Sequence, residues 1–168
     1  MKRLTLIITM LSMLSAGAVI ADDAAPGYVM RYADIGGGQI VFTYEGDLWL
    51  VPEAGGDARR ITSHPGTELA AKFNKDGTKL AFSGSYDGGN DVYLMDVMGG
   101  VPERLTWHPA GDTMLDWCPD EDGVVIRSNR AYPFRGQLYK VFFDGRMPFR
   151  LPVDRGSLAA VAPDHSGL

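Results

Sequence analysis

The chain has few of the residues on which several common kinds of protein depend. It carries one cysteine, Cys118, so no disulfide can form within it. The neighbouring Trp117 and Pro119 indicate that this thiol is buried and is not a catalytic nucleophile. The formal net charge is −5 and the basic residues are scattered. This argues against nucleic acid as a partner, because proteins that bind it present a concentrated cationic surface.

The motifs of common active sites are also missing. There is no Gly-x-Ser-x-Gly elbow, and no serine is credibly paired with a histidine and an acid. The run Gly36-Gly37-Gly38 precedes a predicted strand and opens no helix, so it fits neither glycine-rich phosphate-binding fingerprint. We therefore expect no catalytic residue, no cofactor-binding residue and no metal ligand in this chain.

Two acidic clusters stand in predicted turns. Asp120-Glu121-Asp122-Gly123 begins like a calcium loop, but Ala131 occupies the position where a bidentate glutamate closes such a loop. Asp87, Asn90 and Asp91 form the second cluster. Turn formation accounts for both clusters without a metal ion.

The longest apolar run lies at the amino terminus. Met1-Lys2-Arg3 precedes an apolar run over residues 4–14, and small residues then lead to Ala21. This order predicts a signal peptide over residues 1–21, cleaved after Ala21, and hence an exported protein, periplasmic or extracellular. The alternative, a membrane anchor, is disfavoured because the run is shorter than the roughly twenty residues of a spanning helix. No membrane span is expected after cleavage.

The chain does contain a repeat with a period of about 44 residues. Asp47-Leu48-Trp49-Leu50-Val51 returns as Asp91-Val92-Tyr93-Leu94-Met95 and, loosely, as Gln137-Leu138-Tyr139-Lys140-Val141. The phrases Arg60-Ile61-Thr62, Arg104-Leu105-Thr106 and Arg150-Leu151-Pro152 follow these copies in turn. A repeat of this length indicates that one supersecondary unit is stacked several times.

The second copy predicts four short antiparallel strands. Residues 70–73 and 80–83 flank the turn Asn74-Lys75-Asp76-Gly77, in which Asp-Gly supplies a positive φ. Residues 91–96 and 102–105 supply the third and fourth strands. Both faces of the third strand are apolar, so each sheet should be covered on two sides by its neighbours.

Stacked four-stranded sheets of this kind predict an all-β fold, a partial β-propeller of antiparallel blades. A generic β-sandwich would explain the strands but not the matched turns. After the signal peptide, residues 22–168 form the incomplete propeller, with blade one over about 28–62, blade two over about 68–106, blade three over about 113–152 and a fourth beginning at 157. Because propellers close with about four to eight blades, we expect the chain to be the front of a longer protein.

The histidines and one insertion are the remaining candidates for a functional role. His64 and His108, each followed by proline, occupy equivalent positions after successive blades, which favours a shared turn role over catalysis. His165 is expected at the surface in a hairpin turn. The insertion over residues 127–136 carries several arginines and aromatic residues in a long loop of blade three. Such a loop could bind a peptide backbone or carboxylate, dock a neighbouring domain, or serve packing between blades.

The insertion's members are Arg127, Arg130, Tyr132, Phe134 and Arg135. Together with the phrases Gly27-Tyr28, Glu45-Gly46-Asp47-Leu48-Trp49 and residues 86–93 and 104–109, it resembles the amino-terminal propeller of tricorn-type proteases. The resemblance covers essentially the whole chain after the signal peptide. The repeat itself is shared with the TolB family and with propeller-bearing oligopeptidases.

The resemblance implies a non-catalytic segment of an exported serine peptidase, which gates or guides peptides to a catalytic domain outside this chain. It implies polypeptide substrates and downstream domains of the same protein as partners, with homo-oligomers expected only in the full-length context. Two alternatives stay open. One is a TolB-like periplasmic propeller that binds proteins without catalysis, and the other is the gating propeller of a prolyl-oligopeptidase-type enzyme.

Overall fold

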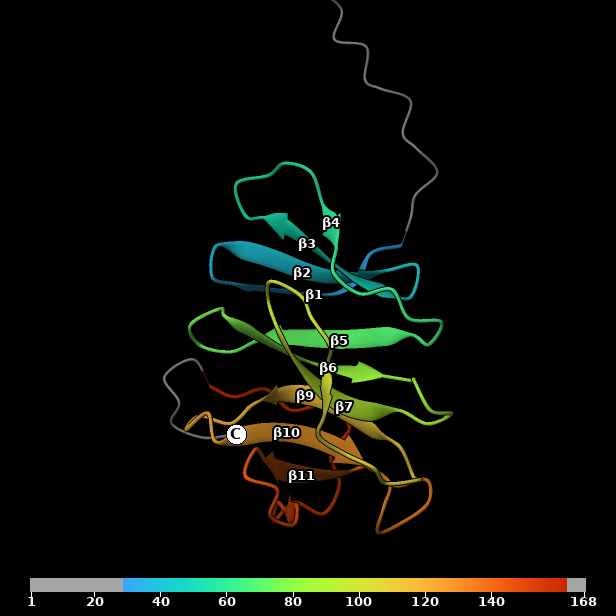
Figure 1. Cartoon of the computed structure of the whole chain (residues 1–168). Coiled ribbons are helices and arrows are strands. Elements are labelled where there is room, and N and C mark those ends of the chain that lie inside the picture. Colours follow the sequence, from blue (N-terminus) through green and yellow to red (C-terminus); the bar gives the residue numbers. More distant parts are fainter. Residues whose placement is uncertain (1–28, 163–168) are drawn as a thin grey trace, which may run out of the picture.

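The computed structural model describes residues 29–162, and the predicted signal peptide and His165 lie outside this range (Figure 1). Every regular element in the described range is a strand. The strands are β1 (Arg31–Gly36), β2 (Gln39–Tyr44), β3 (Asp47–Pro52), β4 (Arg59–Arg60), β5 (Glu68–Phe73), β6 (Lys79–Gly84), β7 (Asp91–Asp96), β8 (Glu103–Arg104), β9 (Asp112–Trp117), β10 (Gly123–Ser128), β11 (Gln137–Phe142) and β12 (Phe149–Arg150). Within residues 29–162, no helix of the length and apolar content that a bilayer span requires occurs.

The strands form three four-stranded antiparallel sheets, each a meander in sequence order. We call β1–β4 blade 1, β5–β8 blade 2 and β9–β12 blade 3. The first strand of each blade lies at one edge of its sheet, and a strand of only two residues lies at the other. The blades stack face to face (Figure 1). The predicted all-β, propeller-like architecture of four-stranded blades is thus confirmed.

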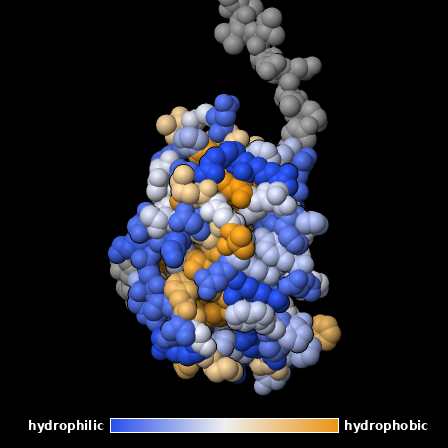
Figure 2. All heavy atoms as spheres, in the orientation of Figure 1, coloured by the Kyte–Doolittle hydropathy of each residue, from blue (hydrophilic) through white to orange (hydrophobic). Residues whose placement is uncertain are grey.

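Two apolar cores fill the spaces between the blades. Blades 1 and 2 share a core that includes Leu48 and Leu50 from one side and Phe82 and Met95 from the other. Blades 2 and 3 share a second core, to which the opposite face of β7 contributes Val92. Strand β7 is therefore buried on both faces, as its unbroken apolar run predicts. The face shown in Figure 2 is mostly hydrophilic, with apolar patches along its middle.

Glycine brings neighbouring hairpin turns into contact. Gly37, with φ of 56°, lies in the turn between β1 and β2, and Gly77, with φ of 71°, lies in the turn between β5 and β6. A Cβ on Gly77 would meet Gly37 Cα at 2.4 Å, so backbone packs directly on backbone here. The glycine run that fits no phosphate-binding motif is thus part of the seam between blades 1 and 2.

The recurring Asp and Arg-x-Thr phrases bond to each other. They link the start of the third strand of a blade to its fourth strand and to the segment that follows. In blade 2, Arg104 forms an ion pair of 2.6 Å with Asp91, and its Nε donates to the Thr106 carbonyl. The Thr106 hydroxyl accepts from Val92 N and donates to Asp91. These bonds satisfy a buried carboxylate and fix the end of the blade.

Blade 1 repeats this arrangement and blade 3 departs from it. Arg60 pairs with Asp47 at 2.9 Å, and the Thr62 hydroxyl accepts from Leu48 N. In blade 3, Gln137 and Pro152 replace the acid and the threonine. This change explains why the third copy of the phrase matches only loosely.

The predicted fourth blade has no assigned strand within residues 157–162. This segment nevertheless contacts blade 3. Val161 N donates to Asp116 Oδ2 at 2.7 Å, and Ala159 packs on the apolar cluster of Leu115 and Val125.

Candidate functional site

A cavity of about 670 Å³ lies where the first strands of the three blades meet. We call it the axial groove. Its lining comes from Tyr32, Ala33, Ala70, Lys72, Thr113, Met114, Leu115, Arg127 and residues 157–160. The groove is thus lined by the middles of β1, β5 and β9, which are far apart in sequence. It brings together residues that the sequence could not place beside one another.

Polar contacts between successive first strands hold the groove together. Asp34 on β1 accepts from Phe73 N at 2.9 Å and forms a 2.8 Å ion pair with Lys72. Trp117 on β9 donates its indole N–H to the Lys72 carbonyl at 2.9 Å. Asp116 accepts from Val161 N in the same manner as Asp34 from Phe73 N. The carboxylates beside the groove are therefore bound to main-chain and lysine donors.

Each first strand carries a bulge at the groove. In β1, Tyr32 and Ala33 fall between the paired residues Arg31 and Asp34. In β5, Ala70 falls in the corresponding break, and β9 has a break opposite Val125 and Ile126. Tyr32 and Ala70 have φ of 56° and 53°, a left-handed conformation that is unfavourable for residues with a Cβ. Bulges of this kind are frequent beside functional sites.

Arg127 is a groove cation for which no ion pair is found within residues 29–162. It occupies the position of β10 that Thr43 has in blade 1 and Ser83 has in blade 2, as the strand registers show. The Thr43 hydroxyl donates to the Glu68 carbonyl of the next blade, and the Ser83 hydroxyl accepts from Met114 N. Arg127 Nε is buried without a hydrogen-bond partner among the described residues. Blade 3 thus has an arginine where blades 1 and 2 have a residue with a small hydroxyl side chain. This arginine and residues 157–160 line the same groove.

Arg130 anchors the base of the insertion. It pairs with the fully buried Asp112 at 2.8 Å, donates to the Ser128 hydroxyl at 3.0 Å and lies over the Tyr139 ring at 4.8 Å. A buried carboxylate requires such a partner, because charge is costly away from water. Arg130 therefore serves packing within blade 3, which differs from the packing between blades that was considered for this loop.

The tip of the insertion is an exposed turn. Arg135 N donates to the Tyr132 carbonyl at 3.2 Å, and Pro133 and Phe134 are the central residues. Phe134 has φ of 72° and is fully exposed. Proline followed by a positive φ is the pattern of a type II turn, in which glycine usually takes the position of Phe134.

His64 and His108 have the same role in their turns. His64 Nδ1 accepts from Gly66 N at 2.9 Å, and His108 Nδ1 accepts from Ala110 N at 3.1 Å. In both turns, the imidazole ring accepts a hydrogen bond from the backbone N–H two residues later in the chain. The geometry is that of a structural turn residue, in keeping with the repeated position.

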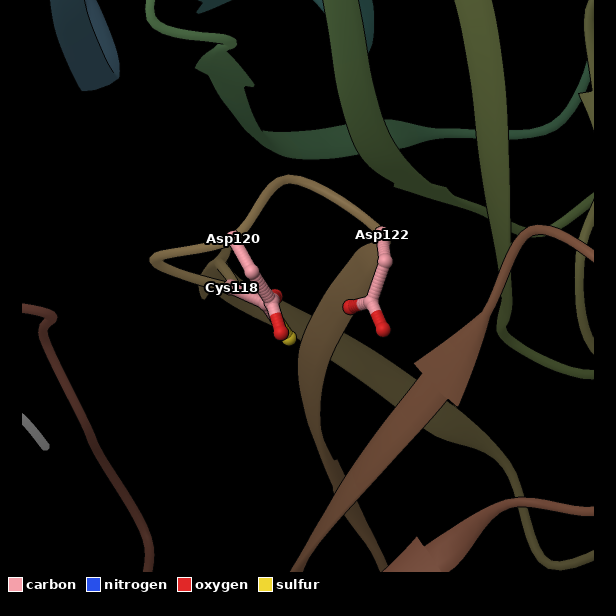
Figure 3. A group of neighbouring side chains, drawn as sticks. All are labelled: Cys118, Asp120 and Asp122. Atoms are coloured by element: carbon pink, nitrogen blue, oxygen red, sulfur yellow. The ribbon is translucent and has the colours of Figure 1, made fainter.

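Cys118, Asp120 and Asp122 lie within 4.8 Å of one another at the turn between β9 and β10 (Figure 3). Lys140 Nζ from β11 pairs with Asp120 at 2.9 Å and with Asp122 at 2.6 Å. Burial raises the pKa of the Cys118 thiol to about 12, so the protonated form prevails. The lysine thus supplies the positive charge that a metal ion would bring, and the thiol is a poor ligand.

In the second acidic cluster, Arg104 has the role that Lys140 has in the first. Arg104 pairs with Asp87 at 2.9 Å as well as with Asp91 at 2.6 Å. Asp91 is buried and Asp87 is exposed. The cluster therefore ties the loop after β6 to the end of blade 2.

Glu68 is a titratable residue that the sequence analysis missed. It is fully buried at the start of β5, where its carboxylate accepts from the Thr62 hydroxyl at 3.0 Å. Burial raises the pKa of Glu68 to about 7, the Thr62 and Tyr86 hydroxyls oppose this, and nearby Asp47 adds to it. Position in the repeat is the signal that could have indicated this residue, because Glu68 and Asp112 both begin the first strand of a blade.

Comparisons with known proteins agree with this architecture. The family model of the tricorn protease N-terminal beta propeller domain matches residues 27–168. Tricorn protease homolog 1 of Streptomyces coelicolor is 33% identical over 102 residues, which are 60% of this chain and 10% of that protein. A putative tricorn-like protease N-terminal subunit of Sulfurisphaera tokodaii is 26% identical over 144 residues, covering 82% of this chain and 72% of that protein.

Solved structures show the same fold. The crystal structure of the tricorn protease superposes with a TM-score of 0.63 at 26% identity, over 74% of this chain and 13% of that one. A putative TolB from Agrobacterium tumefaciens gives 0.67 at 20% identity over 75% of this chain and 47% of that one, a likeness of fold alone. The chain thus spans about a tenth of the length of the Streptomyces relative. It belongs to the family of tricorn protease N-terminal β-propeller domains.

Proposed function

We propose that this chain is the non-catalytic propeller segment of an exported tricorn-like serine peptidase, and that it gates or guides peptides to a catalytic domain elsewhere in the protein. The axial groove is the observation on which this proposal chiefly rests. Three blades contribute their first strands to it, and its lining combines small and apolar side chains with the cations of Lys72 and Arg127. A peptide has apolar and anionic groups that match such a lining.

The relatives support a role in proteolysis. Their names describe tricorn proteases, and one is named a putative tricorn-like protease N-terminal subunit. The acidic groups beside the groove support binding in preference to catalysis, since Asp34 and Asp116 are held by backbone N–H donors.

Export rests on the sequence alone. The basic start, the apolar run and the small residues ending at Ala21 form the three regions of a signal peptide. Amino-terminal sequencing of the protein recovered from its native host should begin at Asp22. Recovery of cell-associated protein that begins at Met1 would contradict export.

Peptide binding can be tested through Arg127. Fluorescein-labelled decapeptides with acidic side chains are titrated against the chain, and fluorescence anisotropy gives the dissociation constant. Because Arg127 Nε lacks a partner among the residues that the structure describes, Arg127→Gln should weaken binding about tenfold, the loss of about one charged hydrogen bond. Arg150→Gln is the matched control, since Arg150 is an exposed arginine on β12, outside the groove.

Equal weakening by the two variants would show a general charge effect and contradict binding in the groove. Failure of the wild-type chain to bind any of the peptides would contradict the proposed function itself.

A further inference from the structure

We propose that Glu68 and Asp47 share one proton, and that this proton closes the seam between blades 1 and 2 as a pH-sensitive latch. The seam between blades 2 and 3 has an arginine at the corresponding place and stays closed as the pH rises. This inference concerns the scaffold and goes beyond the proposed function, since it depends on no ligand of the groove.

The backbone brings the two acids together from opposite sides of the seam. Asp47 is the first residue of β3 in blade 1, and Glu68 is the first residue of β5 in blade 2. Glu68 N donates to the Gly46 carbonyl at 2.7 Å, and the Thr43 hydroxyl donates to the Glu68 carbonyl at 3.2 Å. The start of β5 is therefore fixed beside the residue that precedes Asp47.

The two carboxyl groups have fewer donors than they have buried oxygens. Asp47 Oδ2 pairs with Arg60 at 2.9 Å, and the Thr62 hydroxyl donates its single hydrogen to Glu68 Oε2 at 3.0 Å. The remaining oxygens, Asp47 Oδ1 and Glu68 Oε1, are buried and have no donor within residues 29–162. A buried acceptor in this condition is costly.

A proton on Glu68 supplies the missing donor. In blade 2, the Thr106 hydroxyl donates to Asp91 at 3.1 Å, whereas in blade 1 the Thr62 hydroxyl donates to Glu68 and leaves Asp47 without it. Protonated Glu68 can donate to Asp47, because a carboxylic acid has one O–H. Burial raises the pKa of Glu68 to about 7, and the charge of Asp47 and a side-chain hydrogen bond between the two acids raise it further.

Other titratable groups also lie near this pair. They are Arg60 on β4, His64 after β4, Tyr86 after β6 and Tyr93 on β7. The Tyr86 ring packs on His64 at 4.1 Å, and burial together with the charge of Glu68 raises the pKa of Tyr86. Arg60 is already bound to Asp47, so loss of the shared proton leaves two carboxylates beside one guanidinium.

The other seam is the internal comparison. Asp112 begins β9 as Glu68 begins β5, and Arg130 follows Asp112 by eighteen residues, as Tyr86 follows Glu68. Arg130 pairs with Asp112 at 2.8 Å and balances its charge at any pH at which the chain is folded. A fixed cation therefore neutralises the buried acid of one seam, and a proton neutralises that of the other.

The direction of the pH effect follows from this difference. An open seam lets Glu68 ionise at its ordinary pKa of about 4.5, whereas the closed seam holds the proton up to about 7. The equilibrium constant for opening therefore rises with pH between these values and is constant above them.

Amide hydrogen exchange of the full chain, followed by NMR, tests the latch. Glu68 N reports on the first seam, and Asp112 N, which donates to the Asn90 carbonyl at 2.7 Å, reports on the second. Between about pH 5.5 and about pH 7.5, the protection factor of Glu68 N should fall about twentyfold, whereas that of Asp112 N should stay within about threefold.

Two variants identify the group responsible. Glu68→Gln can donate to Asp47 and does not titrate, so it should abolish the fall at residue 68. His64→Asn, the control for the neighbouring ring, keeps an acceptor for Gly66 N and should retain the fall. In the wild type, the carboxyl carbon signals of Glu68 and Asp47 should shift together, with a common midpoint at about pH 7.

Equal falls at the two amides would show opening of the whole chain and overturn the local latch. A fall that persists in Glu68→Gln, or an Asp47 signal that does not move with that of Glu68, would overturn the shared proton. If Glu68→Gln does not fold, the carboxyl titration of the wild type still decides. Each of these outcomes leaves the proposed function untouched, because no measurement involves a peptide.

Discussion

Glu68 should make the stability of the chain fall as the pH rises through the range from about 4.5 to about 7. The carboxyl is fully buried, and burial is the main reason that its pKa is raised. A carboxyl with a raised pKa keeps its proton in the folded chain after the unfolded chain has lost it. The unfolded state is then favoured progressively until the folded state also ionises.

The size of the effect follows from the two pKa values. One pKa unit corresponds to about 1.4 kcal/mol. A folded pKa of about 7 against an ordinary value of 4.5 therefore corresponds to about 3 kcal/mol of unfolding free energy. This amount is a large part of the 5–15 kcal/mol that stabilises a typical domain.

The assay is urea unfolding of the wild type and of Glu68→Gln across this pH range. The amide can still accept from the Thr62 hydroxyl, so the variant keeps the shape of the site while losing the titration. Relative to the wild type, Glu68→Gln should gain about 3 kcal/mol between about pH 4.5 and about pH 7.5. Glu103→Gln, at an exposed position on β8, is the matched control and should track the wild type. A constant difference between Glu68→Gln and the wild type over this range would refute the reasoning.

Three further predictions concern the blades and their chemistry. Arg130→Met leaves the buried Asp112 without its partner, so urea unfolding should show a loss of about 3–5 kcal/mol, and a loss below about 1 kcal/mol would contradict the buried pair. Gly77→Ala places a Cβ against Gly37 Cα and on a positive φ, so it should cost about 1–3 kcal/mol, whereas Gly88→Ala in open space tests the φ effect alone. Equal costs for the two glycine variants would contradict the backbone contact between blades. The purified chain should show no peptide hydrolysis in a fluorogenic assay, and turnover abolished by a serine-directed reagent would contradict a non-catalytic role.

Much of the fold is predictable from the sequence because it depends on local patterns. The third strand of blade 2 was expected over residues 91–96, and β7 has these bounds. Its two apolar faces also predicted the cores on both of its sides, with Val92 in one and Met95 in the other. The turn residues and the period of the repeat were sufficient for this, since each blade is built from neighbouring segments.

The candidate site was less predictable because it forms where separate blades meet. Ala70 was expected in an ordinary strand, whereas the structure places it in a bulge with positive φ. Arg127 was recognised only as part of an insertion, and its place beside residues 157–160 depends on the packing of blade 3. The burial of Glu68 likewise follows from the seam between blades 1 and 2, which no local pattern specifies.

Photo-crosslinking of a bound peptide tests the central claim, that peptides enter the axial groove, most directly. A decapeptide with a benzophenone side chain is irradiated with the chain, and mass spectrometry locates the attached residues. If peptides enter the groove, crosslinks form on the middles of β1, β5 and β9, at residues 32–33, 70 and 113–115. Crosslinks confined to the outer strands β4, β8 and β12 would contradict the claim.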